Sequence, residues 1–303
     1  MTIIGIDIGQ SGSRARLAGS LGTDVITGPG YWSAPVPQLV HDLVVALSPG
    51  RSALKLGIGL TGYEPQTGQA VAIGSALLTS GIAARVAVAD DGLTAYLGAL
   101  GDTAGGLIAA GTGSVALALD PGTAMARTDG WGSELGDHGS GYWIGREAIR
   151  QALRLVDGQQ ADSLTGALAE QFGPIESISA LWRRQRPGVD EIAAFAHPVI
   201  ELARGGNATC QALLDRAAQQ LAESLAMALR RAGLAERQVP YAALGGIFAA
   251  GDLVGAPFRR AMRDLVPAAF HKAAIGDALD GCIRLAELAP DPVLRPLYET
   301  FGD

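Results

Sequence analysis

The chain has 303 residues, of which 48% are hydrophobic and only 5% aromatic, and its net charge at neutral pH is −7. A chain of this length can bury a large core and usually forms one or two domains. The acidic balance and the few aromatic side chains are the opposite of what a nucleic-acid-binding surface needs, so we expect no nucleic-acid partner.

The two cysteines, Cys210 and Cys282, are far apart and form no CxxC pair, which argues against a disulfide framework or a structural zinc site. The first residues contain no basic segment followed by an apolar one. No apolar run approaches the roughly 20 residues that span a bilayer. We therefore expect a cytoplasmic protein with no membrane partner.

The N-terminal third alternates between strand and helix patterns. Residues 2–8 predict a strand, and RARLAGS and GTDVITGPG predict two short strands after it. Apolar residues at helical spacing predict a helix over 36–48; a strand in KLGIGLTGY, a helix over 68–82, a strand in RVAVADD and a helix in GLTAYLGAL follow. This order, β-β-β-α-β-α-β-α, indicates an α/β lobe over residues 1–103.

A second α/β lobe is predicted over residues 104–288, because GGLIAAGTGSVALALD repeats the strand–turn–strand plan of the opening segment. A long helix is expected to begin near Thr209 as its N-cap, and residues 158–208 predict a helical insertion in this lobe. Residues 289–303 are a candidate completion of the first lobe.

Each lobe opens with a strand pair whose turn contains glycines and hydroxyl residues. Glycine lets the backbone approach a ligand, and successive N–H groups in such turns form an anion-binding concavity. Each turn alone is more typical of an ordinary hairpin, and neither matches a Walker A or Rossmann motif. Together, on opposite sides of a cleft, they predict a polyphosphate site formed by Gly9, Gln10, Ser11, Gly12 and Ser13 in the first turn and Gly111, Thr112, Gly113 and Ser114 in the second.

Two further features fit a nucleotide. Asp7 precedes the first turn, and we expect it to bind Mg²⁺ through water beside the phosphates. The strand in ALGGIFAAG ends in Gly245 and Gly246, which would let an adenine approach the backbone; an ordinary strand-to-helix corner explains this pair equally well.

VADDGLTAY places Asp90 and Asp91 at the C-terminal end of a strand, where the ligand sites of α/β folds open. A carboxylate there can accept the proton of a sugar hydroxyl that attacks a γ-phosphate. One of the two can instead cap the following helix. We assign catalysis to Asp91 and a supporting or capping role on the substrate side to Asp90.

The segment DGWGSELGDHGSGYWIGREAI, residues 129–149, contains Glu134, Asp137 and His138 among glycines. Charged groups on a rigid loop suit the recognition of sugar hydroxyls, so we expect these three side chains and Thr112 to bind the substrate. No HExxH or comparable set is present, so metal ligation by His138 is the weaker interpretation.

Six segments in register resemble the N-acetylglucosamine kinase-like group of the family named after benzoyl-CoA reductase-activating ATPases, in the actin-like ATPase superfamily. In chain order they are GIDIGQSGSR, VADDGLTAYLGAL, LIAAGTGSVAL, GWGSELGDHGSGYWIGREAI, ALGGIFAAG and AAIGDALDG, and they cover nearly the whole chain. The resemblance implies two actin-like (ribonuclease H-like) α/β lobes with a central cleft, and the use of ATP and Mg²⁺. It implies the roles of Mg²⁺-side aspartate for Asp7, catalytic base for Asp91, sugar ligand for Asp137 and phosphate-loop hydroxyls for Ser11 and Thr112.

Three departures from that family's pattern concern the sugar. Residues 10–13 replace its Thr-Lys-Thr loop, GDHGS puts His138 where GDEGS has glutamate, and TGPGYWSAPVP lacks the expected asparagine. Glu134 would favour the ammonium of a free 2-amino group over an acetamide, and the loop resembles that of actinobacterial glucosamine kinases. The predicted activity is therefore ATP-dependent phosphorylation of the 6-hydroxyl of D-glucosamine, with N-acetylglucosamine or another hexose as the alternative.

Two other classes are weaker. A partner-activating ATPase with a bridging iron–sulfur cluster needs cysteines at a dimer interface, and Cys210 and Cys282 lack such a setting. A non-catalytic sugar sensor is disfavoured by Asp91 and by the two phosphate turns. The expected partners are a sugar and a nucleotide, and the sequence leaves a homodimer open.

Overall fold

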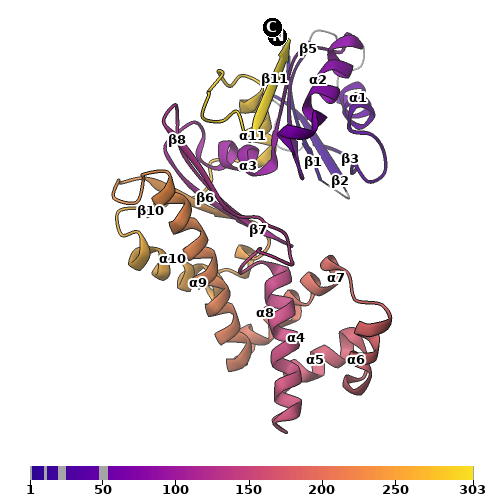
Figure 1. Ribbon diagram of the computed structural model, residues 1–303, viewed down its shortest axis with the longest axis vertical. Coiled ribbons are helices and arrows are strands. Elements are labelled where there is room, and N and C mark those ends of the chain that lie inside the picture. Colours follow the sequence, from indigo (N-terminus) through magenta and orange to yellow (C-terminus); the bar gives the residue numbers. More distant parts are fainter. Residues whose placement is uncertain (1, 10–11, 20–24, 48–53, 303) are drawn as a thin grey trace. The chain divides into compact units, whose positions relative to one another are not determined.

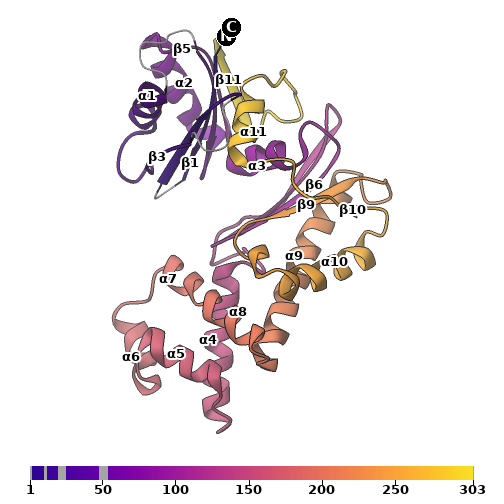
Figure 2. The ribbon, with the colours of Figure 1, turned by 180° about the vertical axis from the view of Figure 1, so that it is seen from behind.

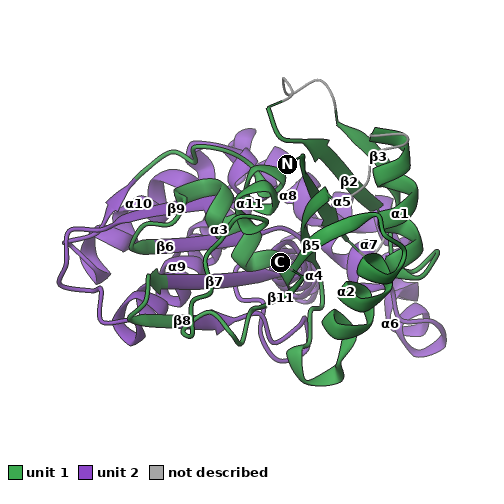
Figure 3. Cartoon of the chain, turned by 90° about the horizontal axis from the view of Figure 1, so that it is seen from above, with its two compact units in different colours: residues 1–105, 119–125, 272–303 green, residues 106–118, 126–271 purple. Residues whose placement is uncertain are grey.

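The computed structural model describes residues 2–9, 12–19, 25–47 and 54–302. The chain divides into two compact units, shown in different colours in Figure 3. Unit 1 contains residues 1–105, 119–125 and 272–303, and unit 2 contains residues 106–118 and 126–271. Across the described residues, no helix is both long and apolar enough to cross a membrane.

Unit 1 is built on a six-stranded sheet in the order β11-β5-β4-β1-β2-β3 (Figure 1). Its strands are β1 (Ile3–Ile8), β2 (Gly12–Leu17), β3 (Ile26–Pro29), β4 (Leu54–Leu60), β5 (Ala83–Asp90) and β11 (Tyr298–Gly302); its helices are α1 (Val36–Leu47), α2 (Gln69–Thr79), α3 (Asp91–Leu100) and α11 (Ala278–Leu285). β4 pairs in parallel with both β1 and β5, and the register aligns Ile8, Leu60 and Asp90. The C-terminal ends of these three strands therefore meet at one edge of the sheet.

The two faces of this sheet differ because side chains alternate along a strand. Ile4, Ile6, Leu56 and Ile58 belong to a buried apolar cluster that also contains residues of α1 and α2. The intervening positions include Gly5 and Gly57, which are paired in register and have no side chain to cover the backbone. In Figure 2, α1 and α2 lie on one side of the strands and α11 lies with α3 on the other.

α11 belongs to unit 1, although the sequence analysis placed residues 272–288 in the second lobe. Glycines bring its backbone into contact with its neighbours. A Cβ atom on Gly57 would lie 1.8 Å from the carbonyl oxygen of Cys282, and one on Gly281 would lie 1.7 Å from that of Thr94. A local pattern predicts a helix but not the sheet on which it packs, which explains the difference. β11 pairs antiparallel with β5 and so adds the edge strand of this unit.

The second sheet lies mostly in unit 2 and has the order β10-β9-β6-β7-β8. Its strands are β6 (Gly105–Ala110), β7 (Ser114–Asp120), β8 (Ala124–Asp129), β9 (Pro240–Leu244) and β10 (Phe270–His271); the helices of the unit are α4 (Gly141–Asp157), α5 (Ser163–Phe172), α6 (Ile175–Arg184), α7 (Val189–Ala194), α8 (Ala196–Arg204), α9 (Ala208–Arg231) and α10 (Asp252–Leu265). The side chain of Asn207 accepts a hydrogen bond from the amide of Cys210 and caps α9, so the N-cap is Asn207 rather than Thr209.

The contact between α11 and α3 generates a prediction about stability. Replacing Gly281 with alanine should lower the free energy of unfolding by roughly 2 kcal/mol or more, because a methyl group would overlap the backbone of α3. Gly166→Ala in α5 is the matched control, since no atom lies within 4 Å of its Cβ position. That change should be neutral or stabilising by up to about 1 kcal/mol. Urea-induced unfolding compares the variants, and equal stability would contradict the backbone contact.

Candidate functional site

In unit 1, Asp7 lies near the end of β1, and Asp91 is the first residue of α3, directly after β5. Both strands run parallel to β4, so the two carboxylates stand at the same edge of the sheet. The carboxyl ends of parallel strands are the usual place for a ligand site in an α/β fold.

The two adjacent aspartates at this edge have different contacts. Asp90 is buried, and its Oδ1 accepts a hydrogen bond of 2.9 Å from the amide of Gly92, so it is the N-cap of α3. Asp91 accepts a hydrogen bond of 2.7 Å from the hydroxyl of Thr61. The amide of Thr61 donates to the carbonyl of Ile8 at 3.0 Å, which ties this hydroxyl to the end of β1. Sequence analysis did not single out Thr61; its position directly after a buried strand was the available signal.

The first predicted phosphate turn is described only in part, because Gln10 and Ser11 lie outside the described residues. The amide of Gly9 donates to the carbonyl of Gly12 at 2.8 Å and closes the turn. Ser13 is buried in β2, and its hydroxyl donates to the carbonyl of Pro29 at 2.8 Å. The hydroxyl of Ser13 therefore donates its proton to β3.

Asp7 is the candidate for the metal. Its Oδ2 lies 2.5 Å from Nη2 of Arg14, which stands opposite it in the β1–β2 register, and this hydrogen bond raises the pKa of Arg14. Among the residues that the structure describes, no group of three or more His, Cys, Asp or Glu side chains could hold a metal ion. A Mg²⁺ ion that keeps most of its waters needs only one such carboxylate beside the phosphates. Asp7 would be the carboxylate beside such an ion, and its pairing with Arg14 would weaken its attraction for the metal.

In unit 2, the second predicted phosphate turn joins β6 to β7 and is held by the start of α4. The amide of Gly111 donates to the carbonyl of Gly113 at 2.9 Å. The amide of Gly141 donates to Gly111 at 2.8 Å, and that of Tyr142 donates to Thr112 at 3.1 Å. The positive end of the α4 helix dipole therefore adjoins this turn, an arrangement that favours a bound anion.

The same turn lines a cavity of about 390 Å³ that is also lined by Gly246, the second glycine of the pair after β9. Gly245 has a φ of +103°, and a Cβ there would lie 2.2 Å from the carbonyl oxygen of Ala110, so only glycine fits this position. The amide of Ile247 donates to the same carbonyl at 3.1 Å. The lining is drawn from three parts of unit 2: Gly111, Thr112 and Gly141; Gly246 and Ile247; and Asp190, Ala193, Ala194, Ala196, His197 and Ile200 of α7 and α8.

The wall formed by α7 and α8 was not found by sequence analysis. It comes from the predicted helical insertion, where alanines at helical spacing are typical of any packed helix. Their small side chains leave space beside the turn, and only the folded chain shows which space they face.

The loop that follows β8 is organised by Asp129, whose side chain is only 3% exposed. Its Oδ1 accepts from the amides of Gly130 at 2.9 Å and Asp137 at 2.6 Å, and its Oδ2 accepts from the amide of His138 at 2.9 Å. One carboxylate thus joins the two ends of the loop. Asp129 and Asp137 have φ values of +62° and +56°, a conformation that costs energy in non-glycine residues and is common at functional sites.

Asp137 connects this loop to the second phosphate turn. Its Oδ1 accepts a long hydrogen bond of 3.3 Å from the amide of Ser114, and the hydroxyl of Ser114 donates to the carbonyl of His138 at 2.9 Å. A Cβ on Gly113 would lie 2.7 Å from Oδ2 of Asp137. Burial raises the pKa of Asp137, aided by the nearby charge of Asp129 and opposed by the amide of Ser114.

Glu134 and His138 have protein partners. Oε1 of Glu134 lies 2.7 Å from Nη2 of Arg186, which also donates to the hydroxyl of Tyr142 at 3.0 Å. Nδ1 of His138 lies 3.1 Å from Oδ2 of Asp129. Asp129 and Arg186 were both missed by sequence analysis; the Asp-Gly pair at a strand end was the available signal for Asp129.

Solved structures with the same fold are two-lobed sugar kinases. A protein from Chromobacterium violaceum assigned as an N-acetylglucosamine kinase is 26% identical, with a TM-score of 0.71 over 94% of this chain and 98% of that chain. A ROK family glucokinase from Streptomyces griseus, solved with glucose and AMPPNP, shares the fold at 18% identity, with a TM-score of 0.54 over 95% and 99% of the two chains. These matches confirm the predicted fold class, α/β with two actin-like lobes.

The chain belongs to the BadF/BadG/BcrA/BcrD ATPase family, which it matches over residues 4–281. It is 24% identical to an N-acetylmuramic acid/N-acetylglucosamine kinase of Clostridium acetobutylicum over 81% of this chain and 85% of that protein. It is 30% identical to an N-acetyl-D-glucosamine kinase of Dictyostelium discoideum over 49% and 48% of the two chains. The family resemblance seen in the sequence is confirmed.

The contacts of Asp129 predict that Asp129→Asn lowers the free energy of unfolding by about 2 kcal/mol. Asparagine tolerates the same φ, but its amide group turns N–H donors toward backbone N–H groups that need an acceptor. Asp157→Asn at the exposed end of α4 is the matched control and should have little effect. Urea-induced unfolding separates the two, and an equal response would show that the carboxylate does not hold the loop.

The raised pKa of Asp137 predicts a pH effect on stability. Between the ordinary aspartate pKa of about 3.9 and the higher folded value, the folded state binds more protons than the unfolded state. The contribution of Asp137 to the free energy of unfolding should therefore fall as pH rises through that interval and stay low above it. Asp137→Asn removes the titration, so the stability of the wild type relative to this variant should decline over that range in a urea series. A pH-independent difference would contradict the assignment.

Proposed function

We propose that this chain is an ATP-dependent amino-sugar kinase that phosphorylates the 6-hydroxyl of N-acetylglucosamine or a closely related N-acetylated sugar. The cavity in unit 2 is the observation that supports ATP as a substrate, because the predicted phosphate turn and the predicted adenosine segment both line it. The names of the two curated relatives support the N-acetylated sugar. D-glucosamine, the sugar favoured by sequence analysis, is the second candidate.

Asp91 is proposed as the general base. In the transfer, the 6-hydroxyl oxygen bonds to the γ-phosphorus as the bond to the β–γ bridging oxygen breaks, the hydroxyl proton passes to Asp91, and ADP leaves. Thr61 donates to Oδ2 of Asp91, which orients the carboxylate. A Mg²⁺ ion beside Asp7 would neutralise charge on the phosphates.

The nucleotide would lie with its phosphates against residues 111–114 and its base between Gly246 and the alanines of α7 and α8. The turn adjoins the positive end of the α4 helix dipole, which would attract the phosphates, while the first amides of α4 hold the turn itself. The turn over residues 9–13 of unit 1 stays a predicted phosphate turn, and its residues 10 and 11 lie outside the described residues. Asp137 adjoins the second turn through Ser114, so the sugar ligand and the phosphate turn are held by one network.

The contacts of Glu134 support an acetamide more than an ammonium. Sequence analysis assigned this carboxylate to the ammonium of glucosamine, but it forms an ion pair with Arg186. A carboxylate neutralised in this way offers an ammonium little net attraction, although the pair is exposed and therefore weak. Recognition of a neutral acetamide needs no such charge.

The partner-activating class has less support. Cys210 and Cys282 are both buried, and burial raises the pKa of both thiols. An iron–sulfur cluster shared across a dimer needs accessible thiolates.

The test is ADP release from ATP and Mg²⁺ with N-acetylglucosamine, N-acetylmuramic acid, glucosamine and glucose. The N-acetylated sugars should have the highest kcat/KM, and Asp91→Asn should lower kcat by roughly 100- to 10,000-fold while leaving sugar affinity largely unchanged. Asp102→Asn, an exposed aspartate of unit 1, is the matched control and should keep full activity. A preference for glucosamine would select the second candidate, and no sugar-dependent ADP release would reject the kinase proposal.

A further inference from the structure

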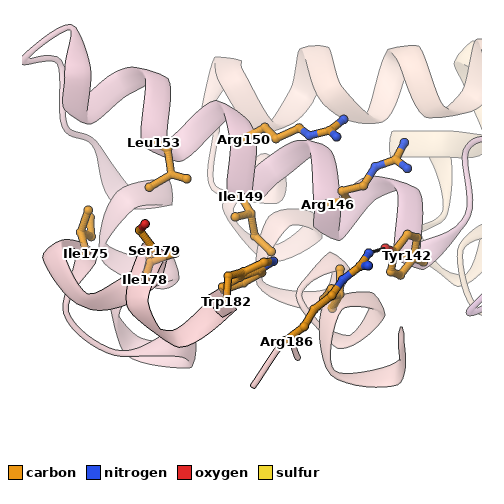
Figure 4. A pocket seen from close by; sticks show the side chains of 11 residues that line it. Tyr142, Arg146, Ile149, Arg150, Leu153, Ile175, Ile178, Ser179, Trp182 and Arg186 are labelled. Atoms are coloured by element: carbon orange, nitrogen blue, oxygen red, sulfur yellow. Dashed lines mark hydrogen bonds between the residues drawn. The ribbon is translucent and has the colours of Figure 1, made fainter. Parts of the chain in front are cut away.

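A second cavity of unit 2, of about 470 Å³, lies between α4 and α6 and has no part in the proposed reaction. Figure 4 shows Ile149 of α4 directed toward Trp182 of α6, and Leu153 of α4 directed toward Ser179 of the same helix. The cavity is open to solvent on one side, and its apolar walls offer water few partners. The remaining lining residues are Tyr142, Arg146, Arg150, Ile175, Ile178, Ser179, Arg186 and Ile192.

All the charged side chains that line this cavity are cationic. Three arginines, Arg146, Arg150 and Arg186, contribute to it, and no acidic residue does. Glu147 contacts Nε of Arg146 at 3.3 Å and Nη1 of Arg150 at 2.7 Å, so a single carboxylate serves both guanidinium groups. The stems of the arginines can cover apolar surface while their charged ends reach water, which places cations at the edge of an apolar chamber.

We propose that this cavity is a binding site for a small amphipathic carboxylate, with an aliphatic or aromatic body among the isoleucines and Trp182 and a carboxylate paired with Arg150 and its neighbours. The volume and the mainly apolar lining with a few polar groups are those of small-molecule sites. An uncharged ligand of the same shape would form no ion pair with the guanidinium groups. The site should therefore bind the carboxylate more tightly than the uncharged ligand.

The site adjoins the proposed nucleotide cavity through α7. Ile192 lines the cavity between α4 and α6, whereas Asp190, Ala193 and Ala194 of the same helix line the other one. A Cβ on Gly145 would lie 1.9 Å from the carbonyl oxygen of Ile192, so α4 and α7 are in backbone contact. A ligand that changes the packing of α7 on α4 would therefore alter the wall that faces the nucleotide.

Binding of octanoate to the full chain, followed by isothermal titration calorimetry, tests the site. One octanoate per chain should bind saturably, and 1-octanol, with the same body and no charge, should bind at least about tenfold more weakly. Equal affinity for the two compounds, or no saturable binding of octanoate, would overturn the proposal.

Two variants test the location. Arg150→Gln should weaken octanoate binding about fivefold, whereas Arg154→Gln, an exposed arginine one turn further along α4, is the matched control and should not change it. Ser179→Phe should fill the cavity and abolish binding; if that variant does not fold, the two arginine variants still decide. Equal effects of Arg150→Gln and Arg154→Gln would place octanoate elsewhere.

A second copy of the chain is the competing occupant. If light scattering shows a dimer that Ser179→Phe dissociates, and octanoate does not bind, the cavity is an interface and the proposal fails.

The coupling through α7 rests on the proposed nucleotide site. It predicts that octanoate changes the affinity of the chain for ADP, and that ADP changes the affinity for octanoate by the same factor. An unchanged ADP affinity would overturn the coupling. A chain that binds no ADP would count against the proposed function, while the octanoate titration still judges this site.

Discussion

The buried carboxylate of Asp129 is the interaction on which the candidate sugar loop depends. It accepts hydrogen bonds from amides at both ends of the loop. Asp129 and Asp137 both adopt left-handed φ values. Such a conformation persists only where the surroundings stabilise it. A buried carboxylate in turn needs several donors to offset the loss of water. The loop geometry and the buried charge therefore stabilise each other, and neither would be favourable alone.

The same network reaches the phosphate turn. Asp137 accepts from the amide of Ser114, while Gly141 and Tyr142 hold the turn from the start of α4. The proposed sugar ligand and the proposed phosphate turn are thus joined by backbone hydrogen bonds. Preorganised donors of this kind need little rearrangement when charge develops, which is the main contribution of a protein to phosphoryl transfer.

Much of this site could be predicted from local sequence. The position of Asp91 follows from a buried strand that ends in two acids, and the turns proposed to bind phosphate follow from glycine and hydroxyl residues between strands. What could not be predicted depends on contacts between distant segments. α11 packs on the sheet of unit 1 because Gly57 and Gly281 leave its backbone room to approach, and no helical pattern specifies that partner. Likewise, the alanines of α7 and α8 face the turn only in the folded chain.

Glu134 shows why a side chain at a motif position need not have the role that its charge suggests. A carboxylate on a sugar loop predicts attraction for an ammonium, yet the partner of this one, Arg186, comes from the distant loop between α6 and α7. Arg186 also donates to Tyr142, whose amide supports the phosphate turn. The ion pair therefore links the insertion to the sugar loop and to the turn, and its effect on substrate choice would be exerted through loop position more than through charge. Because exposed ion pairs contribute little energy, Arg186 can exchange Glu134 for another anion at small cost in free energy.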